Sequence, residues 1–289
     1  EWAEKIISEL KSMPNVVVKN RSQVFGYYDH NMLVMSERIS DHLPKTEKYI
    51  PKQRLWYIRA KEVIISSGSI ERPLVFGNND TPGVMLSSAA KEYLKIYGVL
   101  VGKKPLVFTN NDSGYETAIE FKKNGIDPII LDTRKDPNSE IIKEAKDLNI
   151  NIKNSYVVVA AKGYKKVNSA DIAKISDDKK NISNIENIKC DCICVSGFWT
   201  PTIHLASQSG NKTKFNEEID AFIPNQSKQK ETTLGAANGV FTLEETLKTS
   251  FEKGSELSKK ITNKENKVSI PTVVEKKSSN HDKFWCVPL

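Results

Sequence analysis

The sequence predicts an α/β protein with two Rossmann-like dinucleotide-binding domains, one inserted in the other, and the first of them incomplete. The first observation is a strand at 105–109, a tight turn, a helix at 115–123 and a strand at 128–131. This is the βαβ unit of a doubly wound parallel sheet. The second is the pair of segments 155–175 and 182–188, which together predict a β-meander and so a three-layer architecture.

A third observation is a pair of matching motifs. The apolar strand Val63–Ile65 ends in Ser66-Ser67-Gly68-Ser69, and Asp191–Val195 ends in Ser196-Gly197, with Pro201 beyond. Small residues at the end of a buried strand let the backbone approach a pyrophosphate or a ribose closely. Two copies favour two dinucleotide-binding halves, and the alternative is two unrelated buried strands.

A glycine-rich turn, Thr233 to Gly239, precedes a helix expected from about Thr242. Such a turn offers backbone N–H groups to an anion or a ribose, and the start of the helix is expected to present unpaired N–H groups. The alternative is an ordinary helix-capping turn. The cofactor-binding residues that we predict are Val24, Ser67, Gly68, Ser69, Gly235, Ala236, Ala237 and Gly239. We expect no catalytic residue and no metal ligand.

The expected domain organisation has five parts. They are the remainder of the first half of the first domain at 1–75, a connector at 76–102, the inserted domain at 103–202, a return to the first domain at 203–262, and a Lys/Ser/Asn-rich linker toward a downstream domain at 263–289. The glycine fingerprint of the first domain is expected to lie upstream of Glu1, so that both ends of the sequence are interpreted as cuts.

Composition excludes several classes of function. The net charge is +7, but the lysines are scattered rather than gathered into the basic patch typical of a nucleic-acid-binding protein. No apolar run is long enough for a transmembrane helix, and no secretory signal is present. Cys190, Cys192 and Cys194 alternate in one expected strand, with their side chains on one face, and form no C-x-x-C pair. We expect buried, reduced thiols, no metal and a cytoplasmic protein.

The order of these motifs resembles the pyridine-nucleotide–disulfide oxidoreductase architecture. Over about residues 1–260 the loops resemble, more narrowly, the α subunit of heterotetrameric sarcosine oxidase, and related opine and cyanide-forming oxidase subunits share part of the pattern. The matching segments are Phe25–Asn31, Arg72–Phe76, Asn79–Met85, Asn111–Ser113 and Ser207–Gly210. They fall in loops, where a packed core would not demand them.

The resemblance implies an enzyme that oxidises sarcosine to glycine, with hydrogen peroxide and a one-carbon unit as products. It implies NAD in the N-terminal half of the α subunit, FAD on the β subunit, FMN at the α/β interface and tetrahydrofolate in a downstream domain. The implied partners are the β, γ and δ subunits. This chain would then contribute to NAD binding and subunit assembly, and is expected to be inactive and to bind NAD weakly or not at all when alone.

Two departures from the family pattern refine this expectation. Thr109-Asn110-Asn111-Asp112-Ser113-Gly114 replaces G-x-G-x-x-G, and its side chains would crowd or repel a phosphate, so we do not expect the inserted domain to bind NAD(P)H. Ala236 stands where flavin-binding members carry an acidic residue, which favours NAD over FAD. The rival interpretations are a freestanding NAD(P)H-dependent flavoprotein reductase and a non-catalytic dinucleotide-binding scaffold subunit.

Overall fold

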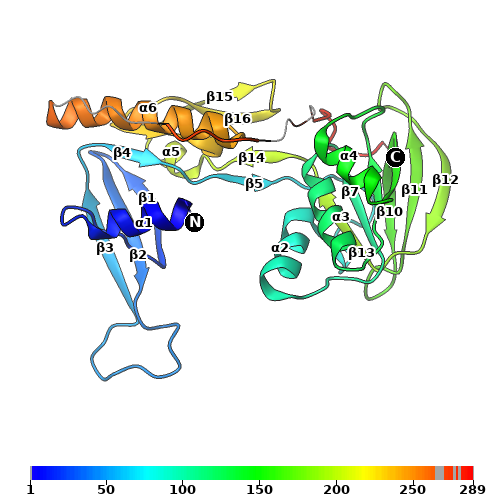
Figure 1. The fold of residues 1–289 in the computed structure, drawn as a ribbon, viewed down its shortest axis with the longest axis horizontal. Helices are drawn as coiled ribbons and strands as arrows, with labels where there is room; N and C mark the ends of the chain where they lie inside the picture. The colour runs from blue at the N-terminus through cyan, green and yellow to red at the C-terminus, as the bar shows by residue number, and fades with distance from the viewer. Residues whose placement is uncertain (1, 264–269, 276–277, 279–280, 289) are drawn as a thin grey trace.

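The computed structural model describes residues 2–263, 270–275, 278 and 281–288, and these residues form two lobes (Figure 1). One lobe contains both the N-terminal meander and the long helix near the C-terminus, and the other contains the middle of the chain. Among the described residues, no helix is long and apolar enough to cross a membrane.

A five-stranded parallel sheet forms the centre of the inserted lobe. Its strand order is β6-β13-β7-β8-β9, and every neighbouring pair is parallel. The strands are β6 (Val84–Leu86), β7 (Pro105–Thr109), β8 (Ile129–Asp132), β9 (Asn151–Asn154) and β13 (Cys192–Ser196). All residues of β7 and β13 are buried, as expected for central strands of a sheet that is covered on both faces.

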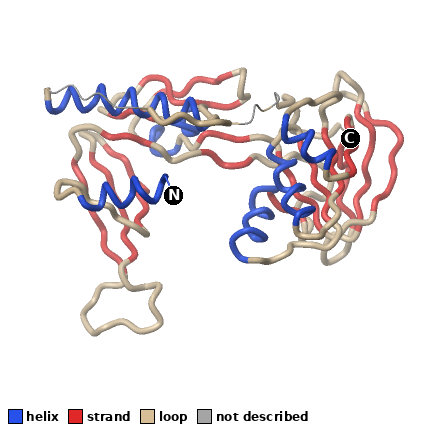
Figure 2. The backbone as a smooth tube through the Cα atoms, in the orientation of Figure 1, coloured by secondary structure: helices blue, strands red, loops and turns tan. Residues whose placement is uncertain are grey.

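Two layers cover this sheet and complete the three-layer architecture (Figure 2). One face packs against the helices α2 (Ser87–Tyr97), α3 (Ser113–Lys123) and α4 (Glu140–Asp147). The other packs against the antiparallel strands β10 (Tyr156–Lys162), β11 (Ser169–Ile175) and β12 (Ile182–Ile188). The predicted α/β class, the βαβ unit and the β-meander are confirmed.

The three cysteines do not share a face, contrary to the prediction. Cys192 and Cys194 lie in β13 and pack in the helix-side core, with their sulfurs 3.6 Å apart. Cys190 precedes the strand and packs in the opposite core, against the meander. The strict alternation that the prediction assumed therefore does not extend back to Cys190, which lies outside the paired strand.

The other lobe combines an antiparallel meander with a short parallel pair. The parallel pair consists of β4 (Val63–Ile65) and β17 (Glu231–Thr233). The helices of this lobe are α1 (Trp2–Ser12), α5 (His204–Gln208), the 3₁₀ helix η1 (Gly235–Asn238) and α6 (Leu243–Thr262). Its other strands are β1 (Ser22–Tyr28), β2 (Met32–Arg38), β3 (Gln53–Arg59), β15 (Lys212–Asn216) and β16 (Ala221–Gln226). The antiparallel strands β5 (Ser69–Glu71) and β14 (Trp199–Pro201) join the two lobes.

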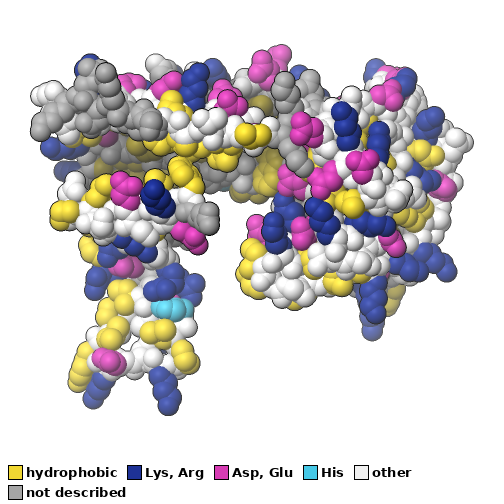
Figure 3. Space-filling view, viewed as in Figure 1, with side chains coloured by type: hydrophobic (Ala, Val, Ile, Leu, Met, Phe, Trp, Pro, Cys, Tyr) yellow, Lys and Arg dark blue, Asp and Glu magenta, His cyan; other side chains and the backbone are white. Residues whose placement is uncertain are grey.

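The parallel pair β4–β17 forms a sheet of two strands among the described residues. Parallel strands are normally paired in larger sheets and covered on both faces, yet Ile64 at the centre of β4 is 49% exposed. Hydrophobic side chains are visible along this part of the surface, below α6 (Figure 3).

The structure also bears on where the inserted unit begins. Gly77 hydrogen-bonds through its backbone to Val159 and Ala161 of β10. Both β6, at the sheet edge, and α2, on its face, belong to the expected connector at 76–102. We therefore propose that the connector is part of the inserted unit. At the other end, residues 281–288 of the expected linker dock on the same lobe.

Candidate functional site

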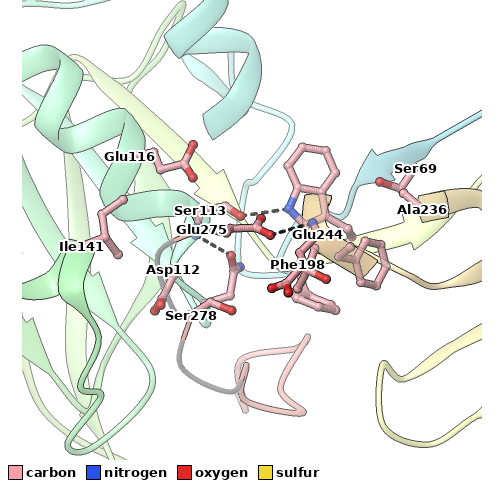
Figure 4. A pocket seen from close by; sticks show the side chains of 14 residues that line it. Ser69, Asp112, Ser113, Glu116, Ile141, Phe198, Ala236, Glu244, Glu275 and Ser278 are labelled. Atoms are coloured by element: carbon pink, nitrogen blue, oxygen red, sulfur yellow. Dashed lines mark hydrogen bonds between the residues drawn. The ribbon is translucent and has the colours of Figure 1, made fainter. Parts of the chain in front are cut away.

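A pocket of about 570 Å³ lies where the two lobes meet (Figure 4). Segments from both lobes and from the C-terminal part of the chain contribute to its walls. The lining residues are Ser69, Asn111, Asp112, Ser113, Glu116, Ile141, Phe198, Trp199, Ala236, Phe241, Thr242, Glu244, Glu275 and Ser278.

The first lobe contributes two loops that are far apart in sequence. Because β4 and β17 are parallel neighbours, the loops that follow their carboxyl ends emerge side by side. The Leu234 N–H donates to the Ile65 carbonyl at 2.9 Å and fixes the two strand ends together. The carboxyl ends of parallel strands are where α/β proteins place their ligands. The loop after β4, Ser66 to Ser69, and the turn after β17 thus lie side by side at one edge of the two-stranded sheet.

Glycines in these loops occupy backbone conformations that other residues avoid. Gly68 has φ of 75° and open space around the position of a Cβ atom, whereas Gly235 has φ of 63°. A Cβ atom on Gly235 would lie 3.2 Å from Cγ2 of Thr246 in α6. The left-handed backbone and the close approach of α6 together make glycine the favoured residue at 235.

The predicted cofactor-binding residues fall into three groups. Ser69 and Ala236 line the pocket. Ser67, Gly68, Gly235, Ala237 and Gly239 lie in the same two loops but not in its walls, and Ala237 is fully buried. Val24 lies in β1 and packs against the core cluster around Tyr27 and Val63, away from the pocket walls. The structure therefore brings all the predicted loop residues together but leaves Val24 half-buried against a core cluster away from them.

The first two N–H groups of α6 are already paired, contrary to the prediction. The N-cap residue Thr242 makes no side-chain capping bond. Instead, Oε2 of Glu275 accepts hydrogen bonds from the N–H groups of Leu243 at 2.8 Å and Glu244 at 3.3 Å. A carboxylate at this position is stabilised by the positive end of the helix dipole. Sequence reasoning missed Glu275 because it follows the helix and returns to its start only in three dimensions.

On the inserted lobe, the turn after β7 is filled by its own side chains. Asn111 donates through Nδ2 to the Ser196 carbonyl and hydroxyl, both at 3.1 Å. Asn110 donates to the carbonyls of Asp282 at 2.9 Å and Phe284 at 2.8 Å. Both asparagines are almost fully buried. The positions where a glycine fingerprint would admit a phosphate are thus occupied by amide groups that bind other parts of the chain.

A buried ion-pair cluster lies beside that turn, at the end of β8. Arg134 pairs with Asp112 at 2.9 Å and Asp132 at 2.8 Å, and Asp132 also accepts from the Tyr115 hydroxyl at 2.8 Å. Burial acts to lower the pKa of Arg134, but the hydrogen bonds and charges of the two aspartates outweigh it and raise this pKa. The guanidinium therefore stays charged and neutralises carboxylates of its own chain.

Aromatic rings form the wall between the lobes, and sequence analysis did not single them out. Phe198 stacks on His281 with ring centroids 3.9 Å apart and meets Phe241 edge-on at 5.2 Å. The Trp199 Nε1–H donates to Ser113 Oγ at 2.9 Å, as the dashed line in Figure 4 shows. Phe198 and Trp199 directly follow the Ser196-Gly197 motif, so their position after a predicted strand end was the available signal.

The charge of the pocket is strongly asymmetric. Its described walls contain four carboxylates, Asp112, Glu116, Glu244 and Glu275, and neither Lys nor Arg. Acidic side chains are visible at the junction of the lobes in Figure 3. Two of the four are paired with cations, Asp112 with the buried Arg134 and Glu116 with Lys91. Among the described residues, no group of His, Cys, Asp and Glu side chains is arranged to hold a metal ion.

Solved oxidoreductases share this fold. L-proline dehydrogenase from P. horikoshii superposes with a TM-score of 0.53 at 19% identity, over 94% of this chain and 50% of that one. The HOCl-induced flavoprotein disulfide reductase RclA from Escherichia coli superposes with a TM-score of 0.57 at 15% identity, over 90% and 54% of the two chains. No protein-family model matches the chain.

Sequence similarity identifies the relatives more narrowly. The chain is 36% identical to the sarcosine oxidase subunit alpha of Rhizobium meliloti (strain 1021) over 239 residues, which are 82% of this chain and 23% of that protein. It is 30% identical to that of Corynebacterium sp. (strain U-96) over 241 residues, 83% and 25% of the two chains. The chain is thus similar to sarcosine oxidase α subunits over most of its own length, and it spans about a quarter of theirs.

Proposed function

We propose that this chain is part of the α subunit of a sarcosine-oxidase-like enzyme and that it contributes to NAD binding and subunit assembly. The observation that carries the proposal is the meeting of two glycine-containing loops at the carboxyl ends of β4 and β17, beside the start of α6. The names of the relatives support the identity of the enzyme and its composition from subunits.

The residues present fit the middle of a dinucleotide on the first-lobe side. The left-handed Gly68 and Gly235 allow a close approach of the backbone, and Ala236 brings no carboxylate to the wall. On the inserted-lobe side the turn after β7 is filled by Asn110 and Asn111, which leaves no room for a phosphate there. We therefore assign the pyrophosphate and ribose to the first lobe, with Ser69 and Ala236 in contact and Gly235 directly behind them in the same turn.

The complete enzyme that we propose demethylates sarcosine oxidatively to glycine, forming hydrogen peroxide and a one-carbon unit. In this proposal the FAD lies mainly on the β subunit, the FMN lies at the interface of the α and β subunits, and tetrahydrofolate binds a downstream domain. The γ and δ subunits complete the assembly. This chain supplies no residue that oxidises the substrate, so its own role is to hold the nucleotide and to contact the partners.

The structure counts against one of the two alternative functions, and the other needs a binding measurement. A freestanding NAD(P)H-dependent flavoprotein reductase would need the inserted lobe to bind its reductant, and the filled turn at Asn110 and Asn111 counts against that. A non-catalytic scaffold subunit would retain the fold without nucleotide binding. Measuring NAD affinity therefore separates the proposed function from the scaffold alternative.

The test uses full-length protein and isothermal titration calorimetry with NAD. Ala236→Asp should weaken NAD binding because a carboxylate in the wall repels the phosphates, and Gly235→Val should weaken it by about 1 to 3 kcal/mol because bulk enters a packed site. Gly254→Val is the matched control, since a Cβ atom at Gly254 in α6 meets no neighbour within 4 Å. Unchanged NAD affinity in Ala236→Asp protein with a native circular dichroism spectrum would refute this site.

A further inference from the structure

Residues 270–275, 278 and 281–288 pass from the first lobe to the inserted lobe, and we call these described residues the strap. Glu275 and Ser278 of the strap line the interlobe pocket. Its two ends are held very differently, and this difference indicates which end can leave the pocket.

The end of the strap at 281–288 is firmly anchored on the inserted lobe. Val75 pairs with it as in a parallel sheet, donating to the Trp285 carbonyl at 2.7 Å and accepting from the Val287 N–H at 2.9 Å. Phe284 and Val287 are buried in the core between the parallel sheet and the meander. Burial of two apolar side chains and saturation of the backbone make this end a part of the fold.

Polar contacts strengthen the same anchor. Asp282 accepts from Thr133 Oγ1 at 3.0 Å and pairs with Lys179 at 3.0 Å, while its backbone N–H donates to the Asn110 carbonyl at 2.9 Å. The strap thereby covers the carboxyl ends of β7 and β8, the edge at which doubly wound domains hold nucleotides.

The Glu275 end, in contrast, is held only lightly at the first lobe. Glu275 itself is exposed, and its neighbour Val274 is 99% exposed. Within the described part of the chain, the Glu275 side chain is held by the two hydrogen bonds from the first N–H groups of α6. A solvent-exposed carboxylate at a helix start is bound weakly, by the helix dipole and two hydrogen bonds.

The chain therefore already places an anion at the position where the proposed function needs a phosphate. Glu275 lies in the same pocket as Ser69 and Ala236 (Figure 4), and its carboxylate uses the N–H groups that a pyrophosphate oxygen would use. Two anions cannot occupy this position together, because they would compete for the same donors and repel each other.

We propose that Glu275 is an intramolecular competitor of the nucleotide: its carboxylate occupies the phosphate position at the start of α6 and leaves that position when a nucleotide binds, while residues 281–288 stay anchored. This inference rests on the proposed nucleotide site. The strap thus sets the apparent affinity of the pocket for anionic ligands, because only the fraction of molecules with Glu275 displaced can bind.

The test compares Glu275→Ala with Glu252→Ala in full-length protein, using calorimetric titration with inorganic pyrophosphate and, separately, with NAD. Glu252 is an exposed carboxylate farther along α6, so its substitution removes the same charge without opening the pocket. Glu275→Ala should bind pyrophosphate about threefold to tenfold more tightly than wild type, and NAD likewise, because the competing anion is gone. Glu252→Ala should match wild type.

The two proposals fail in different ways. If Glu275→Ala and wild type bind both ligands equally, or if Glu275→Ala binds them more weakly or only melts at a lower temperature, Glu275 is merely a helix cap and the inference is wrong. In the case of equal NAD binding, the proposed nucleotide site itself still stands. If pyrophosphate binding tightens but no variant binds NAD, the competitor is real and the proposed NAD function is wrong. Absence of binding to either ligand in every variant overturns both.

Discussion

Glu71 shows how a single buried carboxylate can connect the two lobes. It ends β5, the strand that leads out of the first lobe, and it is only 3% exposed. Its Oε2 atom accepts from the backbone N–H of Ser88 at 2.8 Å and from the Ser88 hydroxyl at 2.6 Å, at the start of α2. Glu71 therefore caps a helix of the inserted lobe from the strand that joins the lobes.

The pKa of Glu71 leads to a prediction about stability. Burial raises this pKa above its ordinary value, and the hydrogen bonds from Ser88 lower it by a smaller amount. Because the unfolded state ionises at lower pH than the folded state, the Glu71 contribution is fully present below about pH 4 and is lost as the pH rises through the folded pKa. The stability of wild-type protein relative to Glu71→Gln should thus fall between acid and neutral pH. The fall should be roughly 1.4 kcal/mol for each pH unit by which the folded pKa exceeds the unfolded pKa.

Urea unfolding of both proteins at several pH values measures this difference. Glu92→Gln, on the exposed face of α2, controls for the loss of one negative charge. A stability difference between wild type and Glu71→Gln that stays constant from acid to neutral pH would contradict the prediction.

For single residues, the sequence predicts the backbone conformation better than it predicts which other residues each side chain contacts. Glycine and small residues after an apolar strand indicate a close approach of the backbone, and this reasoning selects Ser69 and Ala236, which do line the pocket. Glu275 could not be selected, because nothing in its local sequence indicates that it returns to the start of α6. Val24 lies away from the pocket because a residue in a half-buried strand can face either a core or a ligand, and here it faces the core.

Among the elements, the turn between β7 and α3 has the most unusual role. In place of glycines it carries Asn110, whose side chain binds two carbonyls of the strap, and Asp112, which pairs with Arg134. The residue that replaces a glycine of the fingerprint is therefore the same residue that binds the strap. The turn has become a binding surface for the chain itself.

Asn110→Gly should restore a glycine without restoring a nucleotide site. The substitution leaves the Asp282 and Phe284 carbonyls without their donor, which should cost about 1 to 3 kcal/mol of folding stability. Thermal unfolding measures this cost, and titration with NADH should show no gain in binding to the inserted lobe because Asp112 and Arg134 still fill it. Tight NADH binding that depends on this substitution would refute the interpretation.

The control for Asn110→Gly is the same change at Asn184. This residue is exposed and already has a left-handed backbone with φ of 55°, so glycine fits there without loss of a buried bond. Asn184→Gly should therefore leave the unfolding temperature close to that of wild type.

Elements with a clear period were predictable, and short elements were not. The buried strands β7 and β13 and the helix α3 follow directly from apolar runs and helical spacing. The strand β6 has only three residues, too few to show a period, so the sequence indicates only a connector there. Its place at the sheet edge depends on pairing with β13, which lies about a hundred residues later.

On the scale of the whole molecule, the polypeptide chain crosses between the two lobes at only a few places among the described residues. The chain leaves the first lobe along β5, returns along β14, and contacts the inserted lobe again through the strap. The interlobe pocket lies among these three connections, so its shape depends on how the lobes are held together. Sequence analysis predicted the nested domains but not this pocket, because contacts between domains leave no periodic pattern in either one.

The pairing of β4 with β17 also fixes an order of events during folding. β4 is synthesised before the inserted lobe and its partner strand after it, whereas β6 to β13 find one another within a continuous stretch of chain. Closing the longer loop carries the larger entropy cost. In pulse-labelled hydrogen exchange during refolding, amides of β7, β8 and β13 should gain protection before those of β4 and β17. Simultaneous protection would show instead that the two lobes fold as one unit.

The same pairing has a consequence for the chain as it is made. Until β17 has left the ribosome, β4 has no partner strand, and the whole inserted lobe is synthesised during that interval. An unpaired strand edge with apolar side chains can pair with the wrong chain. During that interval β4 is therefore a segment that a chaperone would have to shield.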